Sequence, residues 1–128
     1  MLKRDSLGIN ILVVDDEESI RLLLGKYLSN SFNVHVADSA EEALRLLSKG
    51  RYELAIVDVN MPGKSGKEMF RICRREYPGM NIILMTGMPE LADAVDTVKE
   101  GAFYYLPKPI DLKFLFSLLK RAIEEKEK

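Results

Sequence analysis

The stretch that decides the fold is Leu54-Ala55-Ile56-Val57-Asp58, a short aliphatic run that ends in a carboxylate. The next five residues, 59–63, read VNMPG and contain the turn-forming pair Pro62 and Gly63. An apolar run of this length before a turn predicts a strand that is buried on both faces. In open parallel sheets, ligands bind outside the carboxyl ends of the strands. Asp58 is therefore the first candidate for a functional side chain.

Size and composition indicate one globular domain. The chain has 128 residues, of which 47% are hydrophobic and 30% charged, an ordinary balance for a single core. We expect residues 1–128 to form one domain, with 1–8 as an N-terminal extension and 124–128 as a charged tail or the start of a linker. The net charge of −1 does not favour a nucleic-acid-binding surface that acts through bulk charge.

The longest apolar stretches are only of strand length, and the N-terminus lacks an apolar signal core. These features predict a cytoplasmic protein with neither a membrane span nor a secretion signal. The single Cys73 cannot form an internal disulfide. It falls in a helical pattern, which favours a thiol buried in the core over a reactive one.

Further segments have the character of strands, and helical patterns separate them. The segments are 10–14, 32–37, 81–86 and 103–106. Segment 32–37 alternates apolar and polar residues, which favours an edge position. Helical patterns begin near Glu17, Ser39, Ser65, Pro89 and Asp111. Five strand–helix units predict an α/β fold of the flavodoxin-like (βα)5 type, a doubly wound parallel sheet of strand order 2-1-3-4-5 with helices on both faces.

Particular residues predict the helix ends and the buried helix faces. Ser39 with Glu42, and Ser65 with Glu68, have the spacing of a capping box, and Asp111 is a suitable cap for the last helix. The expected inward faces are Ile20, Leu23, Leu24, Tyr27 and Leu28 in the first helix, Leu91, Ala94, Val95 and Val98 in the fourth, and Leu112, Leu115, Phe116, Leu119 and Ile123 in the last.

The predicted strand order brings Asp15, Asp16 and Asp58 to one crevice. Three converging carboxylates repel one another unless a cation neutralises them. Oxygen ligands without a nearby His or Cys favour Mg²⁺, for which Mn²⁺ could substitute. Thr86 ends the strand at 81–86, and Lys108 follows the strand at 103–106. Together these side chains could hold a phosphoryl group, because its transfer needs mainly positioning and charge neutralisation.

Each of these residues alone has an ordinary structural explanation. An Asp after a strand is usually a turn former, and the acids at 15 and 16 could simply complement a helix dipole. Thr86 would end a strand and Lys108 would be exposed. The combination at these spacings is what favours a site.

The combination of Asp15-Asp16, Asp58, Thr86 and Lys108-Pro109 resembles the receiver domain of bacterial two-component response regulators, and the resemblance covers nearly the whole chain. It implies a regulatory domain that catalyses only its own phosphorylation and dephosphorylation. The phosphoryl donor would be a phosphohistidine on a sensor histidine kinase. The Lys108–Pro109 bond is usually cis in this family, at a modest energetic cost.

The same resemblance implies roles for individual residues. Asp58 would be the phosphoacceptor, and Asp58 and Asp16 would ligate Mg²⁺ directly. The resemblance also implies that Asp15 acts through water, the backbone carbonyl of Asn60 ligates the metal, Lys108 binds the phosphoryl oxygen, Thr86 swings to hydrogen-bond it, and Tyr105 moves inward as a switch. The neighbouring Tyr104 is the alternative to Tyr105 for this switch role.

The last helix suggests an output face. Phe114 lies roughly opposite the inward face of this helix, and Leu118 is expected to flank Phe114. We therefore expect the surface of the fourth helix, fifth strand and last helix to bind a partner or a second copy of the chain when the domain is phosphorylated. Direct contacts with nucleic acid or membrane are not expected.

Two other functions use similar features. A Mg²⁺ phosphatase of the haloacid-dehalogenase type also has an Asp nucleophile at a strand end, but it expects a second Asp where this chain has Asn60. A flavin-binding module shares the fold, but its first loop should be rich in Ser, Thr and Gly, whereas residues 15–18 are all acidic. The kinase, the downstream target, the oligomeric state, the lifetime of the phosphoryl group, and whether the domain belongs to a longer regulator are left open.

Overall fold

The computed structural model describes residues 8–87 and 98–126. Its elements are β1 (Asn10–Val14), α1 (Glu18–Leu28), β2 (Asn33–Ala37), α2 (Ala40–Lys49), β3 (Leu54–Asp58), α3 (Gly66–Glu76), β4 (Asn81–Thr86), β5 (Tyr104–Pro107) and α5 (Leu112–Lys126). The predicted strands 10–14, 54–58 and 81–86 are confirmed, and β2 and β5 each begin one residue later than predicted. Most of the predicted fourth helix lies outside the described residues, as do 1–7 and 127–128.

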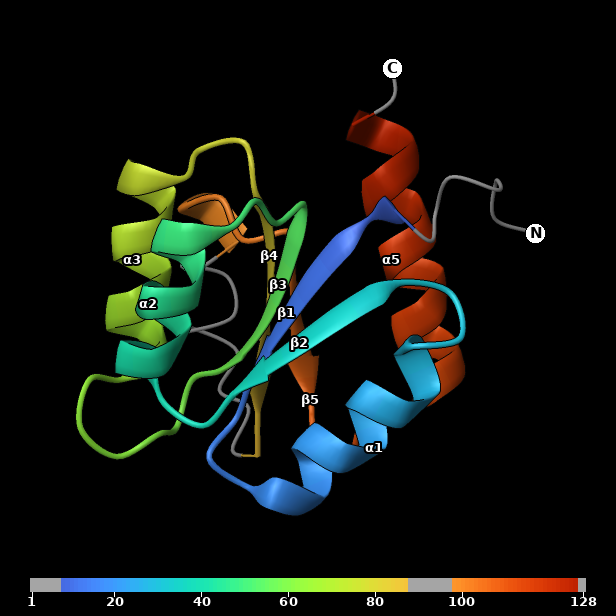
Figure 1. Cartoon of the computed structure of the whole chain (residues 1–128), viewed down its shortest axis with the longest axis horizontal. Helices are drawn as coiled ribbons and strands as arrows, with labels where there is room; N and C mark the ends of the chain where they lie inside the picture. Colours follow the sequence, from blue (N-terminus) through green and yellow to red (C-terminus); the bar gives the residue numbers. More distant parts are fainter. Residues whose placement is uncertain (1–7, 88–97, 127–128) are drawn as a thin grey trace.

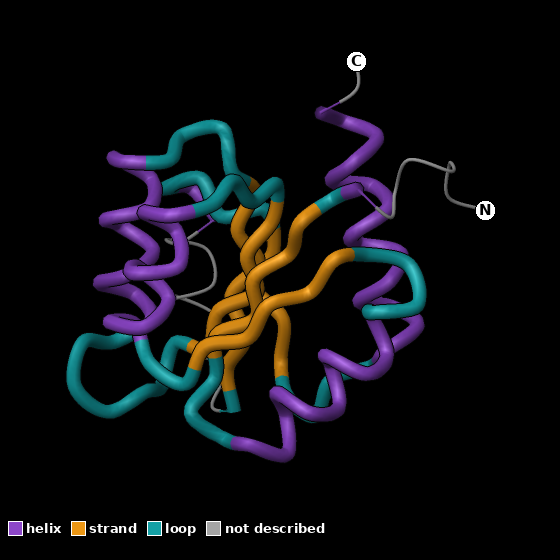
Figure 2. The backbone as a smooth tube through the Cα atoms, viewed as in Figure 1, coloured by secondary structure: helices purple, strands orange, loops and turns teal. Residues whose placement is uncertain are grey.

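The sheet has the predicted topology. Its strands are all parallel, in the order β2-β1-β3-β4-β5. Helices α2 and α3 cover one face of the sheet, and α1 and α5 cover the other (Figures 1 and 2). The register pairs Val14 with Val57 and Thr86 with Pro107. The carboxyl ends of β1, β3, β4 and β5 therefore lie along the same edge of the sheet.

The hydrophobic core is divided by the sheet into two layers. Leu12, Ala55 and Leu84 face α2 and α3, whereas Ile11, Ile56 and Ile83 face α1 and α5. Successive side chains of a strand point to opposite faces, so the central strands need apolar residues at every position. This explains the continuous aliphatic runs in β1, β3 and β4.

The edge strand and the cysteine also follow the sequence predictions. Most residues of β2 are at least partly exposed, including His35, whose Nδ1 lies 2.9 Å from the hydroxyl oxygen of Tyr52. Cys73 is buried in the layer under α2 and α3. Burial raises the pKa of its thiol to about 11, which keeps it protonated and unreactive at neutral pH.

Two of the three predicted helix caps are complete. Ser65 and Glu68 exchange both hydrogen bonds of a capping box, and Asp111 Oδ1 accepts a hydrogen bond from the backbone N–H of Phe114 at 3.1 Å. Ser39 does cap α2, but the reciprocal half of that prediction is wrong. The carboxylate of Glu42 is bound by Arg45 at 2.7 and 2.9 Å instead.

Three predicted helix faces need correction. Val98 was expected to face inward in the fourth helix but is 48% exposed. Leu23 was expected to face inward but is 45% exposed, whereas Leu24 and Leu28 of α1 are buried. Leu118 was expected beside the exposed Phe114 but is fully buried. The buried stripe of α5 runs through Leu115, Leu118, Leu119, Ala122 and Ile123, which is the i, i+3, i+4, i+7, i+8 spacing of a helix packed on a sheet.

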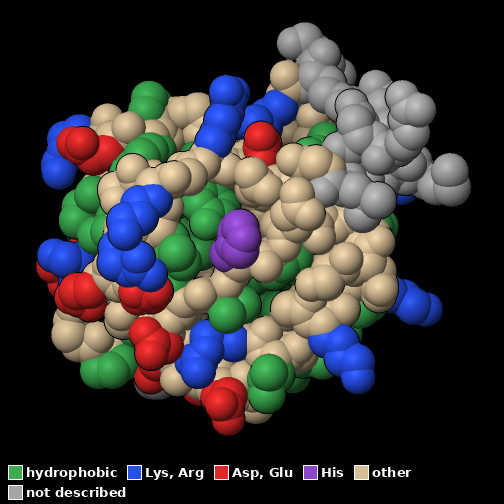
Figure 3. Space-filling view, viewed as in Figure 1, with side chains coloured by type: hydrophobic (Ala, Val, Ile, Leu, Met, Phe, Trp, Pro, Cys, Tyr) green, Lys and Arg blue, Asp and Glu red, His purple; other side chains and the backbone are tan. Residues whose placement is uncertain are grey.

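The surface is mixed in charge. On the face seen in Figure 3, acidic and basic side chains are interspersed, without a continuous area of one sign. Within the described ranges, none of the helices combines the length and the apolar character that crossing a bilayer requires.

Candidate functional site

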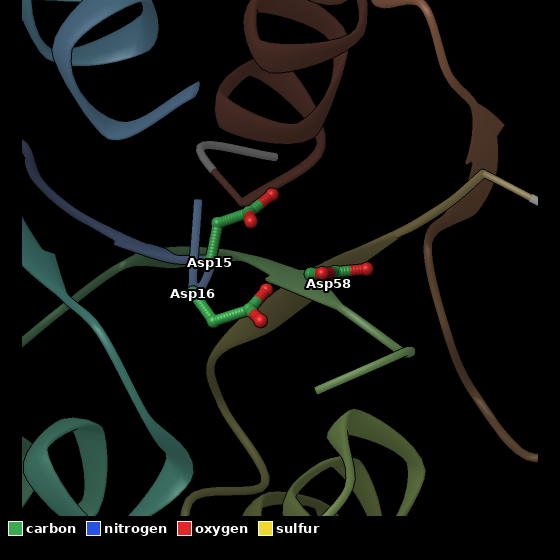
Figure 4. A group of neighbouring side chains, drawn as sticks. All are labelled: Asp15, Asp16 and Asp58. Atoms are coloured by element: carbon green, nitrogen blue, oxygen red, sulfur yellow. The ribbon is translucent and has the colours of Figure 1, made fainter. Parts of the chain in front are cut away.

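Three carboxylates meet at the carboxyl edge of the sheet (Figure 4). Asp15 and Asp16 directly follow β1, and Asp58 is the last residue of β3. One oxygen atom from each of the three carboxylates lies within 4.8 Å of the other two. Asp15 and Asp58 are buried, whereas Asp16 is exposed. The cluster predicted from the sequence is therefore present, and it opens to solvent on the side of Asp16.

Backbone N–H groups hold the two buried carboxylates in place. Asp15 Oδ1 accepts a hydrogen bond from the N–H of Glu17 at 2.9 Å. Asp58 Oδ1 accepts one from the N–H of Asn60 at 3.1 Å. Arg21 of α1 donates to the backbone carbonyl of Asp15, also at 2.9 Å. The carboxylates are thus fixed before any ligand binds.

Lys108 forms ion pairs with three of the surrounding acids. Its Nζ is 2.9 Å from Asp15 Oδ2, 3.1 Å from Glu17 Oε1 and 3.5 Å from Asp58 Oδ2. Burial of the ammonium lowers its pKa, but the nearby carboxylates of Asp15 and Glu17 raise it more, so that the pKa of Lys108 reaches about 12. Lys108 is therefore fully charged at neutral pH. The Lys108–Pro109 bond is cis, as predicted.

The charge on Asp58 is not fully balanced. Burial raises the pKa of its carboxyl group, the hydrogen bond from Asn60 lowers it, and the charges of Asp15 and Asp16 raise it against the opposing effect of Lys108. The net result is a pKa above the ordinary value. The ionised Asp58 would gain from a further positive charge nearby.

The donor set fits a hard divalent cation. The three side chains offer only oxygen atoms, which suit Mg²⁺ or Ca²⁺. Within the part of the chain that the structure describes, Asp15 Oδ2 is buried without a hydrogen bond, although Lys108 forms an ion pair with it. Polar atoms in such positions normally have a partner. The site can therefore accept a metal ion.

Thr86 and Asn60 lie at the same edge of the sheet. Thr86 is buried at the end of β4, and its hydroxyl donates a hydrogen bond to Asn60 Oδ1 at 3.0 Å. The hydroxyl of Thr86 thus contacts the loop that follows Asp58.

The two tyrosines of β5 lie on opposite faces of the sheet. Tyr105 packs against the core layer under α2 and α3. Tyr104 packs on the other side and makes an edge-to-face contact with Phe114, with ring centroids 5.4 Å apart. The side chain of Phe114 is 39% exposed. Tyr104 and Phe114 therefore belong to one surface, and Tyr105 to the other side of the strand.

Comparison with known proteins agrees with this geometry. The family described as "Response regulator receiver domain" matches residues 11–120. This chain belongs to that family. The receiver domain in a protein from Clostridium thermocellum, solved by crystallography, superposes with a TM-score of 0.87 and 34% identity, covering 93% of this chain and 97% of that chain. Membership of this family identifies the domain as a phosphoacceptor switch. The alternative, a phosphatase of the haloacid-dehalogenase type, is not supported.

Curated relatives of the receiver domain are longer proteins. A DNA-binding transcriptional regulator NtrC from Proteus hauseri is 34% identical over 115 residues, which are 89% of this chain and 24% of that protein. The response regulator protein FleR from Pseudomonas aeruginosa is 35% identical over 116 residues, 90% of this chain and 24% of that protein. The chain thus spans about a quarter of the length of these relatives.

Two residues that position the receiver site were not identified from the sequence. Glu17 contacts Lys108, although the sequence indicated only that a helix begins near it. Gly66 begins α3, where a Cβ atom would lie 2.0 Å from the carbonyl oxygen of Asp58. The sequence shows a glycine directly after the helix cap Ser65, but the close approach of this glycine to Asp58 could not be inferred.

The raised pKa of Asp58 leads to a first prediction. The folded domain holds the Asp58 proton more tightly than the unfolded chain, so in metal-free buffer this group reduces stability as pH rises from about 4 through the raised pKa. The full penalty is present once the pH exceeds the raised pKa. Asp58→Asn should therefore raise the thermal midpoint by a few degrees in EDTA, and the difference should vanish near pH 3. If Asp58→Asn has a lower thermal midpoint than wild type at pH 7, the ionised carboxylate of Asp58 does not destabilise the fold.

Proposed function

We propose that this receiver domain takes a phosphoryl group onto Asp58 from a phosphohistidine of a sensor histidine kinase, and that phosphorylation changes its output surface. The observation that carries the proposal is the position of Asp58. Its carboxylate is buried beside two further acids and lies 3.5 Å from the Lys108 ammonium. The nucleophilic oxygen of Asp58 would thus have a cation and a potential metal site beside it, which is sufficient for phosphoryl transfer.

In the proposed transfer, an Asp58 oxygen attacks phosphorus. A P–O bond forms, the P–N bond of the phosphohistidine breaks, and the leaving imidazole keeps the electron pair and takes a proton from water. Lys108, whose ammonium lies 3.5 Å from Asp58 Oδ2, would stabilise negative charge on a phosphoryl oxygen. Hydrolysis of the acyl phosphate by water would reverse the modification, so the domain would catalyse only its own phosphorylation and dephosphorylation.

The proposal includes Mg²⁺, with Mn²⁺ as a substitute. Asp16 and Asp58 would hold the ion directly, Asp15 through a water molecule, and Asn60 through its backbone carbonyl. When bound, the ion would supply neutralisation of the charge shared by the acids and the phosphoryl oxygens. The all-oxygen donor set and the buried Asp15 Oδ2 support this assignment.

Thr86 and Tyr105 form the proposed switch. The Thr86 hydroxyl would leave Asn60 Oδ1 and bond a phosphoryl oxygen. This movement of Thr86 at the end of β4 would make room for Tyr105. Because Tyr105 is only half-buried in the adjacent core layer, it could then move further inward. The change would reach the surface through β5, where Tyr104 contacts Phe114 of α5.

The biological setting is part of the proposal. The domain would work in the cytoplasm. One relative, NtrC, is named as a DNA-binding transcriptional regulator, and this chain spans about a quarter of its length. We propose no direct contact with nucleic acid or membrane for this domain. We take 1–128 as one domain, with 1–8 as an N-terminal extension and 124–128 as a charged tail or the start of a linker.

Acetyl phosphate provides the test of the proposed function. Wild-type protein incubated with acetyl phosphate and Mg²⁺ should gain the mass of one phosphoryl group, and Asp58→Asn should gain none. EDTA should suppress the gain in the wild type. Equal labelling of both proteins, or no labelling of a folded wild type, would reject the proposal.

The output face gives a second prediction. The phosphorylated wild type should form a dimer in sedimentation velocity. Phe114→Ala should raise the dissociation constant of that dimer about tenfold, because exposed aromatic anchors carry much of the binding energy at interfaces. Leu22→Ala, which removes an exposed side chain from α1, is the matched control. If phosphorylated wild type stays monomeric and binds nothing through this face, the assignment of Phe114 is wrong.

A further inference from the structure

The ammonium of Lys108 is shared among three acids. A lysine ammonium carries three N–H donors, and three carboxylates, from Asp15, Glu17 and Asp58, lie within 3.5 Å of Nζ. The contact with Asp58 is the longest of the three. When a phosphoryl group is on Asp58, the carboxylates of Asp15 and Glu17 compete with it for the ammonium.

Glu17 differs from the other two acids because it is the N-cap residue of a helix that its side chain does not cap. It occupies the N-cap position of α1, but among the described residues its side chain makes no capping hydrogen bond. The carboxylate instead extends to Lys108, 91 residues later in the chain. Ser, Thr, Asp and Asn are the usual N-cap residues, and Glu is long enough to reach the lysine instead.

The two acids that hold Lys108 most closely differ in how readily they can release it. The side chain of Asp15 is fully buried, and its Oδ2 atom has Lys108 as an ion-pair partner and no hydrogen bond among the described residues. Losing Lys108 would leave Asp15 as an uncompensated buried charge. The side chain of Glu17 is 57% exposed, so water can replace the ammonium. Glu17 is therefore the acid that can release Lys108 at small cost.

We propose that Glu17 is a positioning residue that competes with Asp58 for the Lys108 ammonium in the unphosphorylated domain and releases it when a phosphoryl group arrives. This inference rests on the proposed function, since it assigns Lys108 to the phosphoryl group. Glu17 sets the basal rate of phosphorylation by competing for the ammonium. An ion pair with one exposed member is weak, so loss of the competition accelerates phosphorylation about two- to fivefold.

Three substitutions separate this competition from a general effect of negative charge. Glu17→Gln removes the charge and keeps the shape. Glu17→Asp keeps the charge, but its side chain is one methylene too short to reach Lys108 and is well suited to cap α1. Glu18→Gln removes the same charge from the adjacent position, which is exposed in the first turn of α1.

The experiment measures the initial rate of phosphorylation by acetyl phosphate at fixed Mg²⁺, and the affinity for beryllofluoride by calorimetry. Glu17→Gln and Glu17→Asp should both phosphorylate about two- to fivefold faster than wild type and bind beryllofluoride more tightly by a similar factor, while Glu18→Gln stays close to wild type. Thermal midpoints confirm that each variant is folded.

The inference is overturned if Glu17→Asp behaves as wild type, if Glu18→Gln accelerates as much as Glu17→Gln, or if Glu17→Gln has no effect. An Asp58→Asn sample run beside them distinguishes this failure from failure of the proposed function. If wild type is labelled and Asp58→Asn is not, the function stands and only the role of Glu17 is rejected. If Asp58→Asn is labelled as fast as wild type, the proposed function fails first.

Discussion

Replacing Lys108 with Met is expected to destabilise the metal-free domain by about 3 kcal/mol. The Lys108 side chain is only 13% exposed, and it is an ion-pair partner of the fully buried Asp15. Without the ammonium, Asp15 and Asp58 would be two like charges close together in a poorly hydrated site. Urea unfolding in EDTA measures the loss, and Mg²⁺ in excess should reduce it, because binding to the folded state adds stability.

The exposed Lys113 of α5 is the matched control for this substitution. Lys113→Met removes one positive charge and adds the same side chain on the surface, and it should change stability by less than about 0.5 kcal/mol. If Lys108→Met is no less stable than Lys113→Met in EDTA, the buried cation does not hold the acids together, and its place in the site has to be reconsidered.

Replacing Gly66 with Ala should have an effect of similar size on stability. An added Cβ would lie 2.0 Å from the carbonyl oxygen of Asp58 and 2.6 Å from the Cα of Val59. Both contacts are with backbone, so α3 or the end of β3 has to move. We expect a loss of about 3 kcal/mol and, in the fraction that remains folded, slower phosphorylation, because the backbone that carries the acceptor is displaced.

Gly79→Ala provides the control for the glycine substitution. Gly79 is exposed, and an added Cβ there would meet nothing within 4 Å. Its stability should stay within about 0.5 kcal/mol of wild type. A Gly66→Ala domain as stable as Gly79→Ala would show that α3 can shift away from Asp58 freely, and the close approach would then have no role in positioning the acceptor.

Much of the fold could be predicted because burial on both faces leaves a clear pattern. The continuous aliphatic runs of β1, β3 and β4 and the alternation in β2 were sufficient for the strand order. Helix faces were harder to predict where leucines are adjacent. Leu23 and Leu24 are equally apolar, and only packing against the sheet decides that Leu24 is buried and Leu23 exposed.

The candidate site was predictable where the strand order alone determines proximity. Asp15, Asp16 and Asp58 had to meet once β1 and β3 were neighbours. The contact of Glu17 with Lys108 could not be predicted, because it depends on the conformation of two loops and on the reach of a flexible side chain. The approach of Gly66 to Asp58 was also hidden, since sequence does not give the distance between a helix and a strand end.

The central claim is that Asp58 is the residue that accepts the phosphoryl group. Borohydride reduces an aspartyl phosphate to homoserine, so reduction of the freshly phosphorylated protein followed by peptide mass mapping identifies the acceptor. The account predicts that Asp58 is converted, that the conversion requires Mg²⁺, and that Asp15 and Asp16 in the same sample remain unmodified. Conversion of another residue in place of Asp58, or equal conversion in EDTA, would contradict it.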